Sequence, residues 1–328
     1  MGLSEIPSLL FIFALQINTK IKKKKYMSKK LNIHQREYRD SSKKPDLGRR
    51  PDWLKVRLPS GDNYNEVLKL MRKSSLNTVC EEANCPNLSE CWSSKTATFM
   101  ILGDTCTRSC GFCNVKLGLP NELDLDEPRR VAESAVDLGL KHVVITSVDR
   151  DDLKDGGVQM FSESIRLINE KLPNTTIEIL IPDFKGEERL FEEIMKYPPT
   201  VLNHNLETVQ RLYHAVRPQA DYQRSLNLIQ WFKNNGLRTK SGIMVGIGET
   251  KEEVIGIMHD LRKHGCDVMT IGQYLQPTKD HLPVDRFVTP EEFAYYKKEG
   301  MKLGFLAIES SPLTRSSYHA DKHAKLIG

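Results

Sequence analysis

From residue 97 onwards, short apolar runs alternate with longer segments of helical periodicity, and this alternation constrains the fold more than any other feature. Six runs have the length and composition of strands: ATFMIL (97–102), HVVIT (142–146), TIEILI (176–181), TVLNHN (200–205), TKSGIMV (239–245) and DVMTIG (267–272). The helical segments between them include residues 128–140, 159–172, 224–236 and 251–265. Strands that alternate with helices indicate βαβ units and a parallel sheet.

Repeated right-handed crossovers curl a parallel sheet into a full or partial barrel. We therefore predict an α/β fold, a partial (β/α)6 barrel of the TIM type, over residues 96–309. Chemistry in such folds sits on the loops that follow the C-terminal ends of the strands. Residues 27–95 are interpreted as an N-terminal extension with one predicted helix at 64–74, and residues 310–328 as a C-terminal segment.

The stretch CTRSCGFC (106–113), here called the cysteine loop, directly follows the first predicted strand. Structural zinc sites usually have paired C-x2-C knuckles and four ligands. This loop offers only Cys106, Cys110 and Cys113, and no fourth Cys or His lies nearby. In a four-iron cube each iron takes one ligand from outside the cube. Three thiolates would leave one iron open, as a catalytic metal keeps a position vacant for its substrate.

Three more cysteines lie in CEEANCPNLSEC, where Cys80, Cys85 and Cys91 form what is here called the upstream trio. This trio is also one ligand short of four. Cysteines are often simply buried, but three within twelve polar and poorly periodic residues favour a ligand set. The chain has seven cysteines and no convincing export signal, so we expect a reducing compartment and metal-binding thiols rather than disulfides. The seventh, Cys266, is expected in the core.

The C-x3-C-x2-C spacing, with Phe112 before the last cysteine, resembles the radical S-adenosylmethionine (SAM) superfamily. This resemblance implies that Cys106, Cys110 and Cys113 hold a 4Fe-4S cluster whose open iron is chelated by the amino and carboxylate groups of SAM. An electron from the cluster then cleaves the sulfonium to give a 5′-deoxyadenosyl radical. A structural zinc protein is the alternative, and it would be colourless when purified without air.

The order of the two trios, C-x4-C-x5-C and then C-x3-C-x2-C, resembles the lipoyl synthase family, and the resemblance extends over most of residues 45–325. The other matching stretches are TSVDRDDLKDGG (146–157), NHNLETV (203–209), VRPQADYQRSL (216–226), TKSGIMVGIGET (239–250), QYLQPT (273–278) and RSSYHAD (315–321). One departure is Ser311, which stands where the family usually has a Gly before Pro. Because Gly permits backbone angles that Ser disfavours, the path of the terminal segment is in question.

In that family a serine of the R-S-S-Y motif is the fourth ligand of a second, auxiliary 4Fe-4S cluster, which here implies Cys80, Cys85, Cys91 and Ser317. A serine oxygen is a harder ligand than a thiolate and suits iron–sulfur sites less well. We expect that bond to be the weakest of the cube, with Arg315 as the cation that helps to keep the alkoxide deprotonated. Catalytic roles are therefore assigned to Ser317 and Arg315. For RSSY alone, the alternative is a C-terminal turn or cap.

The resemblance implies an enzyme that inserts two sulfur atoms, at C6 and C8, into an octanoyl group carried on a protein lysine. The implied cofactors are two 4Fe-4S clusters and SAM. The implied partners are an octanoylated lipoyl carrier domain or a glycine cleavage H-type protein, a low-potential electron donor and an iron–sulfur cluster carrier. Another radical SAM sulfur-insertion enzyme or a methylthiotransferase is the alternative, since it would share the cysteine loop but place its auxiliary cysteines differently.

Polar residues that follow the second and fourth predicted strands are candidates for contacts with SAM. Superfamily members bind the methionyl amine at the first of these places, and the second could hold the ribose or the sulfonium end. Such Ser, Asp and Asn residues could instead cap the helices that follow. The predicted SAM-binding residues are Phe112, Thr146, Ser147, Asp149, Asn205 and Glu207.

The N-terminus is strongly basic: residues 1–60 contain 15 Lys or Arg and 5 Asp or Glu. A basic arm can bind nucleic acid, but no aromatic residues alternate with these lysines as a stacking platform requires, so no nucleic-acid partner is expected. The apolar run 6–17 lacks a preceding Lys or Arg and a cleavage site. We expect Met27 to begin the working protein and 1–26 to be an upstream extension, with a transit or membrane-surface segment as the alternative. A cytoplasmic protein without a membrane span is predicted.

Overall fold

The structure is a computed structural model that describes residues 47–56, 62–93, 98–318 and 320. The expectations for residues 1–26 and for most of the basic arm lie outside the described residues. Eight strands form one sheet. In their order across the sheet they are β1 (Asn77–Thr78), β2 (Thr98–Ile101), β5 (His142–Ser147), β6 (Thr176–Leu180), β7 (Val201–Asn203), β8 (Arg238–Val245), β9 (Val268–Gln273) and β10 (Ala307–Ser310).

Neighbouring strands from β2 to β10 are all parallel. The six predicted strands are confirmed within one or two residues at their ends. Four strands were not predicted. In the large sheet they are β10, which extends the parallel sheet beyond β9, and β1, which pairs antiparallel with β2. The other two, β3 (Thr105–Cys106) and β4 (Lys116–Leu117), form a separate two-stranded sheet. The pairings of the described residues do not join β10 back to the first strands, as expected for a partial barrel.

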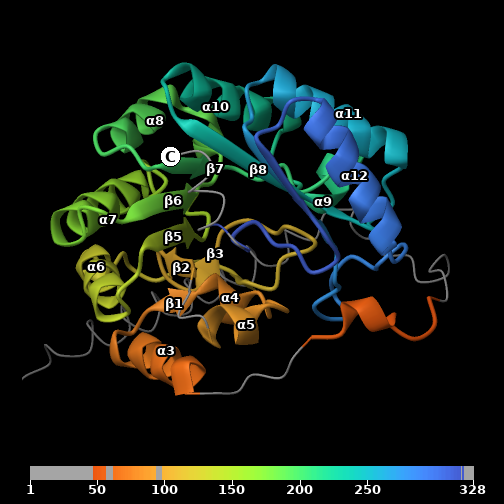
Figure 1. Ribbon diagram of the computed structural model, residues 1–328. Helices are drawn as coiled ribbons and strands as arrows, with labels where there is room; N and C mark the ends of the chain where they lie inside the picture. The colour runs from red at the N-terminus through yellow and green to blue at the C-terminus, as the bar shows by residue number, and fades with distance from the viewer. Residues whose placement is uncertain (1–46, 57–61, 94–97, 319, 321–328) are drawn as a thin grey trace, which may run out of the picture.

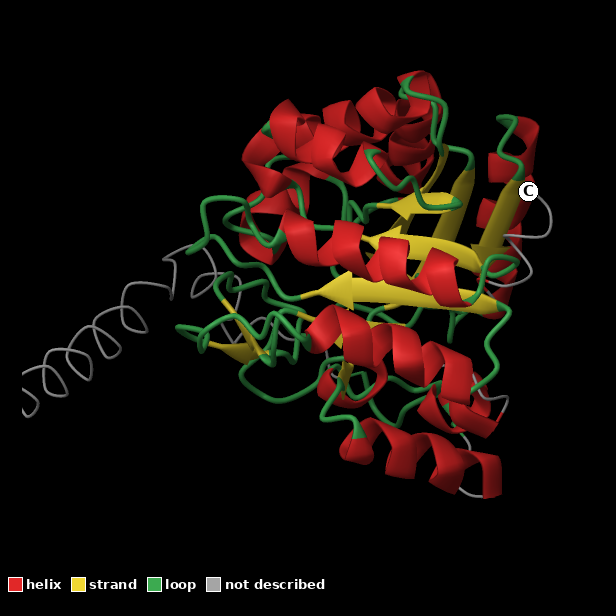
Figure 2. Cartoon of the chain, turned by 90° about the vertical axis from the view of Figure 1, so that its left-hand side faces the viewer, coloured by secondary structure: helices red, strands yellow, loops and turns green. Residues whose placement is uncertain are grey.

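Helices lie along the outer side of the curved sheet (Figure 1), and Figure 2 shows several of them in front of the strands. The predicted helices are confirmed, and α4, α5, α8, α9 and α12 are additional. Their bounds are α6 (Glu127–Asp137), α7 (Val158–Lys171), α8 (Glu188–Met195), α9 (Tyr213–Val216), α10 (Tyr222–Asn234), α11 (Lys251–Lys263) and α12 (Pro290–Lys302). The upstream part of the chain forms α3 (Asp62–Lys73), α4 (Val79–Glu82) and α5 (Leu88–Ser93). No described helix is long and apolar enough to cross a membrane.

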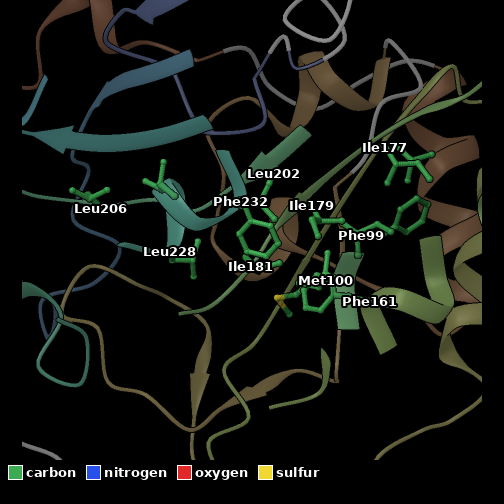
Figure 3. Close-up of a cluster of buried hydrophobic side chains, with 14 of the residues drawn as sticks. Phe99, Met100, Phe161, Ile177, Ile179, Ile181, Leu202, Leu206, Leu228 and Phe232 are labelled. Carbon is green, nitrogen blue, oxygen red and sulfur yellow. The ribbon is translucent and has the colours of Figure 1, made fainter. Parts of the chain in front are cut away.

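The hydrophobic core lies between the sheet and these helices (Figure 3). Alternate strand residues such as Phe99 and Ile179 point toward Phe161 of α7 and Phe232 of α10, and all four side chains are fully buried. Successive residues of a strand point to opposite faces, so the residues between them face the other side of the sheet. Cys266 is fully buried in this core, as expected.

The face of the sheet that points away from the helices carries a buried ion pair. Lys240 of β8 bonds to both carboxylate oxygens of Glu178 of β6, at 3.0 and 3.1 Å, and neither side chain is exposed. Asn203 of β7, between them in the sheet, donates to the same carboxylate at 2.9 Å. The strand register explains the contact, because Glu178, Asn203 and Lys240 all lie on the inner face of neighbouring parallel strands.

Replacing Lys240 with Met is expected to lower the free energy of unfolding by about 3–5 kcal/mol, because Glu178 would be left charged and buried without its partner. Urea denaturation followed by circular dichroism measures this loss. The double variant Lys240→Met with Glu178→Leu is expected to recover much of it, and Lys302→Met, which removes an exposed pair with Glu299, should have little effect. A single variant as stable as the wild type would show that the pair does not support the sheet.

Candidate active site

A cavity of about 780 Å³ opens at the C-terminal ends of the parallel strands. All three thiols of the cysteine loop line it, together with Cys80 and Cys85 of the upstream trio. The other lining residues that the sequence singled out are Phe112, Thr146, Ser147, Asp149, Asn205, Glu207, Arg315 and Ser317. Residues from five separate stretches of the chain therefore meet in one space.

The cysteine loop follows β2 and is fixed by short contacts to other loops. Its first cysteine belongs to β3 (Thr105–Cys106), which pairs with β4 (Lys116–Leu117). Gly111 donates its N–H to the Val216 carbonyl at 2.8 Å and accepts from the Leu282 N–H at 3.0 Å. A Cβ at Gly111 would lie 2.7 Å from Leu282, so glycine is needed for this close packing.

Each thiol of the loop has a raised pKa because it is buried. Burial raises the pKa of Cys110 to about 12 and that of Cys113 to about 11, and it raises the pKa of Cys106 further. The N–H groups of Arg108 and Asp149 each lie 3.4 Å from the Cys106 sulfur, where they would stabilise a thiolate. The thiols would thus remain protonated near neutral pH until a metal centre replaces the protons.

The upstream trio is a second group of buried thiols. Burial and the nearby Cys85 raise the pKa of Cys80 to about 12, while burial, Cys80 and Cys85 raise the pKa of Cys91 to about 12. Cys91 therefore lies near the other two, although it does not line the cavity. The N–H groups of Asn87 and Leu88 oppose the effect of burial at Cys85.

Residues 311–318 of the C-terminal segment lie beside the upstream trio (Figure 1, dark blue beside orange α4 and α5). Asn87 donates to the Leu313 carbonyl at 2.7 Å, and the Tyr318 hydroxyl donates to Glu90 at 3.0 Å. These contacts, which span more than 220 residues of sequence, bring Ser317 to the cavity beside Cys80 and Cys85.

The departure at Ser311 does not disturb this path. Ser311 is not among the described residues with a left-handed backbone. Its hydroxyl bonds to the Thr314 hydroxyl at 2.8 Å, and its carbonyl accepts from the Thr314 N–H. A glycine is needed instead at Gly272 in β9, where an added Cβ would collide with the Thr314 carbonyl. The turn therefore forms with a serine, and Gly272 allows the segment to approach the strand.

Three predicted SAM-binding residues that line the cavity have buried polar atoms without a hydrogen-bond partner among the described residues: Ser147 Oγ, Asp149 Oδ1 and Asn205 Oδ1. Asp149 Oδ1 still has the charge of Arg108 3.2 Å away. A buried polar atom without a partner is costly, so Ser147 and Asn205 suit a polar ligand best. Thr146 differs, because its hydroxyl already donates to the Leu180 carbonyl at 3.0 Å.

Glu207 has a strained backbone at this site. Its φ is 68°, a left-handed conformation that non-glycine residues adopt rarely and that concentrates at functional sites. A backbone bond pair with β8 holds it, since its N–H donates to the Gly242 carbonyl and its carbonyl accepts from the Met244 N–H, both at 2.9 Å. Burial raises the pKa of its carboxyl group, and Asn205 donates to it at 3.1 Å.

Arg217 is a site residue to which the sequence analysis gave no role. Its buried guanidinium lines the cavity and donates to the Asn205 carbonyl at 2.7 Å and to the Tyr213 hydroxyl at 2.8 Å. Its Nε has no hydrogen-bond partner among the described residues, and its charge acts on Cys110 to lower the thiol's pKa against the larger effect of burial. It is therefore a cation available to an anionic group. It lies in the stretch VRPQADYQRSL, where composition alone does not distinguish a buried arginine from an exposed one.

No three His, Cys, Asp or Glu side chains within the described ranges are grouped closely enough to hold one metal ion. A single zinc draws its thiolates to about 2.3 Å from one point, whereas a cube of four irons spreads its ligands over separate corners. Two sets of three largely buried thiols, five of which line one cavity, have backbone N–H donors and unsatisfied polar atoms beside them. They fit iron–sulfur clusters and a polar ligand better than structural zinc.

Family models match two parts of the chain. Residues 100–261 match the radical SAM superfamily, and residues 19–85 match the N-terminal domain of lipoyl synthase of that family. The lipoyl synthase of Flavobacterium johnsoniae is 58% identical over 275 residues, which cover 84% of this chain and 96% of the relative. The chain belongs to the lipoyl synthase family.

Other lipoyl synthases show the same extent of similarity. That of Rubrobacter xylanophilus is 55% identical over 84% of this chain and 87% of its own length, and the mitochondrial lipoyl synthase of Nematostella vectensis is 54% identical over 84% and 94%. Lipoyl synthases are radical SAM enzymes that use SAM and two 4Fe-4S clusters. The alternative of a different sulfur-insertion enzyme or a methylthiotransferase is not favoured.

Solved structures agree on the fold of this lipoyl synthase family member. SuiB of Streptococcus suis bound to SAM has a TM-score of 0.52 at 14% identity, over 77% of this chain and 58% of that one. HydG, a maturase of the [FeFe]-hydrogenase, has a TM-score of 0.53 at 15% identity, over 81% and 67%. The predicted radical SAM partial barrel is thereby confirmed.

Proposed function

We propose that this chain inserts two sulfur atoms, at C6 and C8, into an octanoyl group that is amide-linked to a lysine of a carrier protein. The observation that carries the proposal is the shared cavity: the cysteine loop, Cys80 and Cys85 of the upstream trio, and Ser317 all border one space at the strand ends, and Cys91 lies near Cys80 and Cys85. A reaction that generates a radical at one centre and takes sulfur from another needs both centres to face the same substrate.

The residues that would hold the cofactors follow from this arrangement. Cys106, Cys110 and Cys113 would hold the cluster that binds SAM. Cys80, Cys85, Cys91 and Ser317 would hold the auxiliary cluster. When bound, these groups supply a low-potential electron, a 5′-deoxyadenosyl radical and sulfide. The residues proposed to contact SAM are Phe112, Thr146, Ser147, Asp149, Asn205 and Glu207, and Arg217 joins them as a cation for an anionic group.

The protein's own contribution is to position the reactants and exclude water. A methylene C–H bond of an alkyl chain is not acidic enough for any side-chain base to remove its proton, so a radical route is required. Ser147 and Asn205 offer unpaired polar atoms to a bound ligand. Phe112 packs on the apolar cluster that contains Leu212 and Ile247, and lines the cavity, so it shields the reacting atoms from solvent.

Arg315 is proposed to assist Ser317 as a catalytic residue. Burial lowers the pKa of its guanidinium, while Cys85 and Glu207 in their charged forms would raise it, so Arg315 lies between the upstream trio and the proposed SAM site. A cation there would stabilise an alkoxide at Ser317. The weak serine bond would suit a cluster that gives up sulfide.

We also propose the finer assignments that go with this function. The partner is an octanoylated lipoyl carrier domain or an H-type protein, and an electron donor and a cluster carrier serve the clusters. Residues 27–95 form the N-terminal extension, residues 96–309 the partial barrel and residues 310–328 the terminal segment that bears the serine ligand. The site of action is the cytoplasm.

Mass spectrometry of an octanoylated carrier peptide tests the function. After anaerobic incubation with the protein, SAM and a strong reductant, the peptide is expected to gain two sulfur atoms, with two C–H bonds replaced by C–S bonds. The dithiol keeps the hydrogen count of the substrate, and its oxidation to the disulfide removes two hydrogen atoms. A peptide left unchanged by protein that cleaves SAM would contradict the proposed substrate. A parallel reaction without the octanoyl peptide is the control, and it measures how much SAM the protein cleaves in the absence of substrate.

Replacing Ser317 with Ala is expected to remove the fourth ligand of the auxiliary cluster, since alanine has no oxygen to bind iron. Sulfur insertion should fall strongly, while formation of 5′-deoxyadenosine continues. Ser316→Ala is the matched control, because it removes the adjacent hydroxyl. If the Ser317 variant inserted both sulfur atoms at the normal rate with a full second cluster, Ser317 would not be the ligand.

A further inference from the structure

The three residues between Cys106 and Cys110 are each anchored to another part of the molecule. The Thr107 N–H and hydroxyl both donate to the Asp149 carbonyl, at 3.0 and 2.9 Å. Ser109 bonds Gln219 twice, through its N–H at 3.2 Å and its hydroxyl at 2.9 Å. A loop that only presents two thiols does not need a contact from every intervening residue, so these contacts suggest that the loop must be held in one conformation.

Arg108, the middle residue of this spacer, makes the strongest set of contacts. Its side chain is only 3% exposed. It forms a forked pair with Asp151, at 2.8 and 2.9 Å, and donates to Asp183 at 2.7 Å. Its Nε lies 3.2 Å from Asp149 Oδ1. One guanidinium therefore joins the cysteine loop to the loops that follow β5 and β6.

Asp183 is itself held firmly from the other side. It is fully buried, and its second oxygen accepts from Arg224 of α10 at 2.8 Å. Burial would raise the pKa of its carboxyl group, but Arg108 and Arg224 outweigh burial and hold this pKa far below its usual range. The two residues after it, Phe184 and Lys185, have left-handed φ values of 44° and 57°, so the loop that presents Asp183 is strained.

These contacts close into a ring. Arg224 binds Asp183 and also donates to the Gln219 carbonyl at 3.1 Å, and Gln219 returns to Ser109, the neighbour of Arg108. A closed ring of hydrogen bonds, built around the buried Arg108–Asp183 pair, has few alternative arrangements. Only an arginine can bind Asp151 and Asp183 at once in this way, because its planar fork carries five N–H donors, whereas lysine is a compact point charge.

The ring also controls the surroundings of Cys106. The side chain of Asp149 is half-buried and lies against Arg108, with its Oδ2 3.9 Å from the Cys106 sulfur and its N–H 3.4 Å from the same atom. Without Arg108, this carboxylate and its N–H would lose their fixed position beside the sulfur. Asp183 would keep Arg224, but the positive charge that faces Asp149, Asp151 and Asp183 together would be gone, and the field at the centre would become more negative.

We propose that Arg108 is the positioning residue of the cysteine loop, which locks the loop to Asp151 and Asp183 and holds Asp149 beside Cys106 so that the bound cluster has a fixed geometry and charge environment. This inference rests on the proposed assignment of Cys106, Cys110 and Cys113 to a cluster, and not on the identity of the carrier substrate.

The test compares Arg108→Met and Arg108→Lys with the wild type as anaerobically prepared holoprotein. Hydrogen exchange of peptides that span 106–113 measures local opening. Breaking a buried charge network is costly, so the Met variant is expected to exchange these amides at least about tenfold faster. The midpoint potential of the SAM-sensitive EPR signal should fall, because the reduced cluster loses the stabilising positive charge of Arg108. The spectral change on adding SAM should also become smaller. The Lys variant should retain the potential better than the loop protection.

Arg166→Met is the matched control, because Arg166 on α7 pairs with Glu163 and Glu170 and is 36% exposed. It should leave exchange and potential as in the wild type. Unchanged loop exchange and potential in both Arg108 variants would overturn the proposal. If Arg108→Met fails to fold, Gln219→Ala is measured in its place, beside Arg108→Lys. The Gln219 variant removes only the side-chain contacts to Ser109. Loop exchange at the wild-type rate in both of these variants would also overturn the proposal. None of these readouts uses a carrier peptide, so an error in the proposed substrate would leave them unaffected.

Discussion

Replacing Cys106 with Ala is expected to abolish formation of 5′-deoxyadenosine, down to the background of the assay. The remaining Cys110 and Cys113 cannot hold three corners of a cube, so the iron that binds SAM is lost with the cluster. Sulfur insertion should stop for the same reason. Iron content should fall by roughly four per chain, since each cube holds four irons.

The matched control for this variant is Cys266→Ala. Cys266 is the one cysteine outside both trios, and it is fully buried in the core, where its thiol donates to the Val268 carbonyl. Its loss should lower stability but leave the iron content and SAM cleavage intact. A Cys106 variant that still formed 5′-deoxyadenosine at the wild-type rate would exclude the cysteine loop as the source of the radical.

Replacing Cys80 with Ala is expected to separate the two half-reactions. Cys80 belongs to the upstream trio, so the variant should lose the auxiliary cluster and insert no sulfur. The cysteine loop is anchored by contacts of its own to the Val216 carbonyl and to Leu282, so SAM cleavage should continue with octanoyl substrate present. Chromatography of 5′-deoxyadenosine beside mass spectrometry of the peptide measures both activities in one reaction.

Two outcomes would contradict this account of the Cys80 variant. Normal sulfur insertion would mean that the upstream trio does not supply the sulfur. The variant could instead lose both 5′-deoxyadenosine formation and sulfur insertion while EPR still shows its cysteine-loop cluster. That result would mean that the two sites do not act separately. Cys266→Ala again serves as the control for loss of a buried thiol.

The sequence predicted the sheet well because central parallel strands are buried on both faces and appear as continuous apolar runs. The elements that were missed have weaker patterns. In β10, at the edge of the sheet, only Ile308 and Ser310 are buried. The signal for α12 was present, since Thr289 and Glu292 form a capping box with Pro290 at the first helical position. In α8, Leu190, Phe191 and Ile194 form an apolar face within only eight residues.

The site was only partly predictable. Short spacings located both cysteine trios, because ligands of one centre can lie in one loop. That Ser317 lines the same cavity as Cys80 and Cys85 could be inferred only from the family resemblance, because it depends on how distant segments fold together. The role of Arg217, and the partners of Arg108 on the loops after β5 and β6, follow from tertiary burial that no local pattern indicates.

The central claim is that the two trios anchor two separate four-iron clusters around one cavity. Iron, sulfide and zinc analysis of oxygen-free protein tests it most directly. The account predicts about eight irons and eight sulfides per chain and no stoichiometric zinc. About four irons per chain after full reconstitution, or zinc in their place, would contradict it.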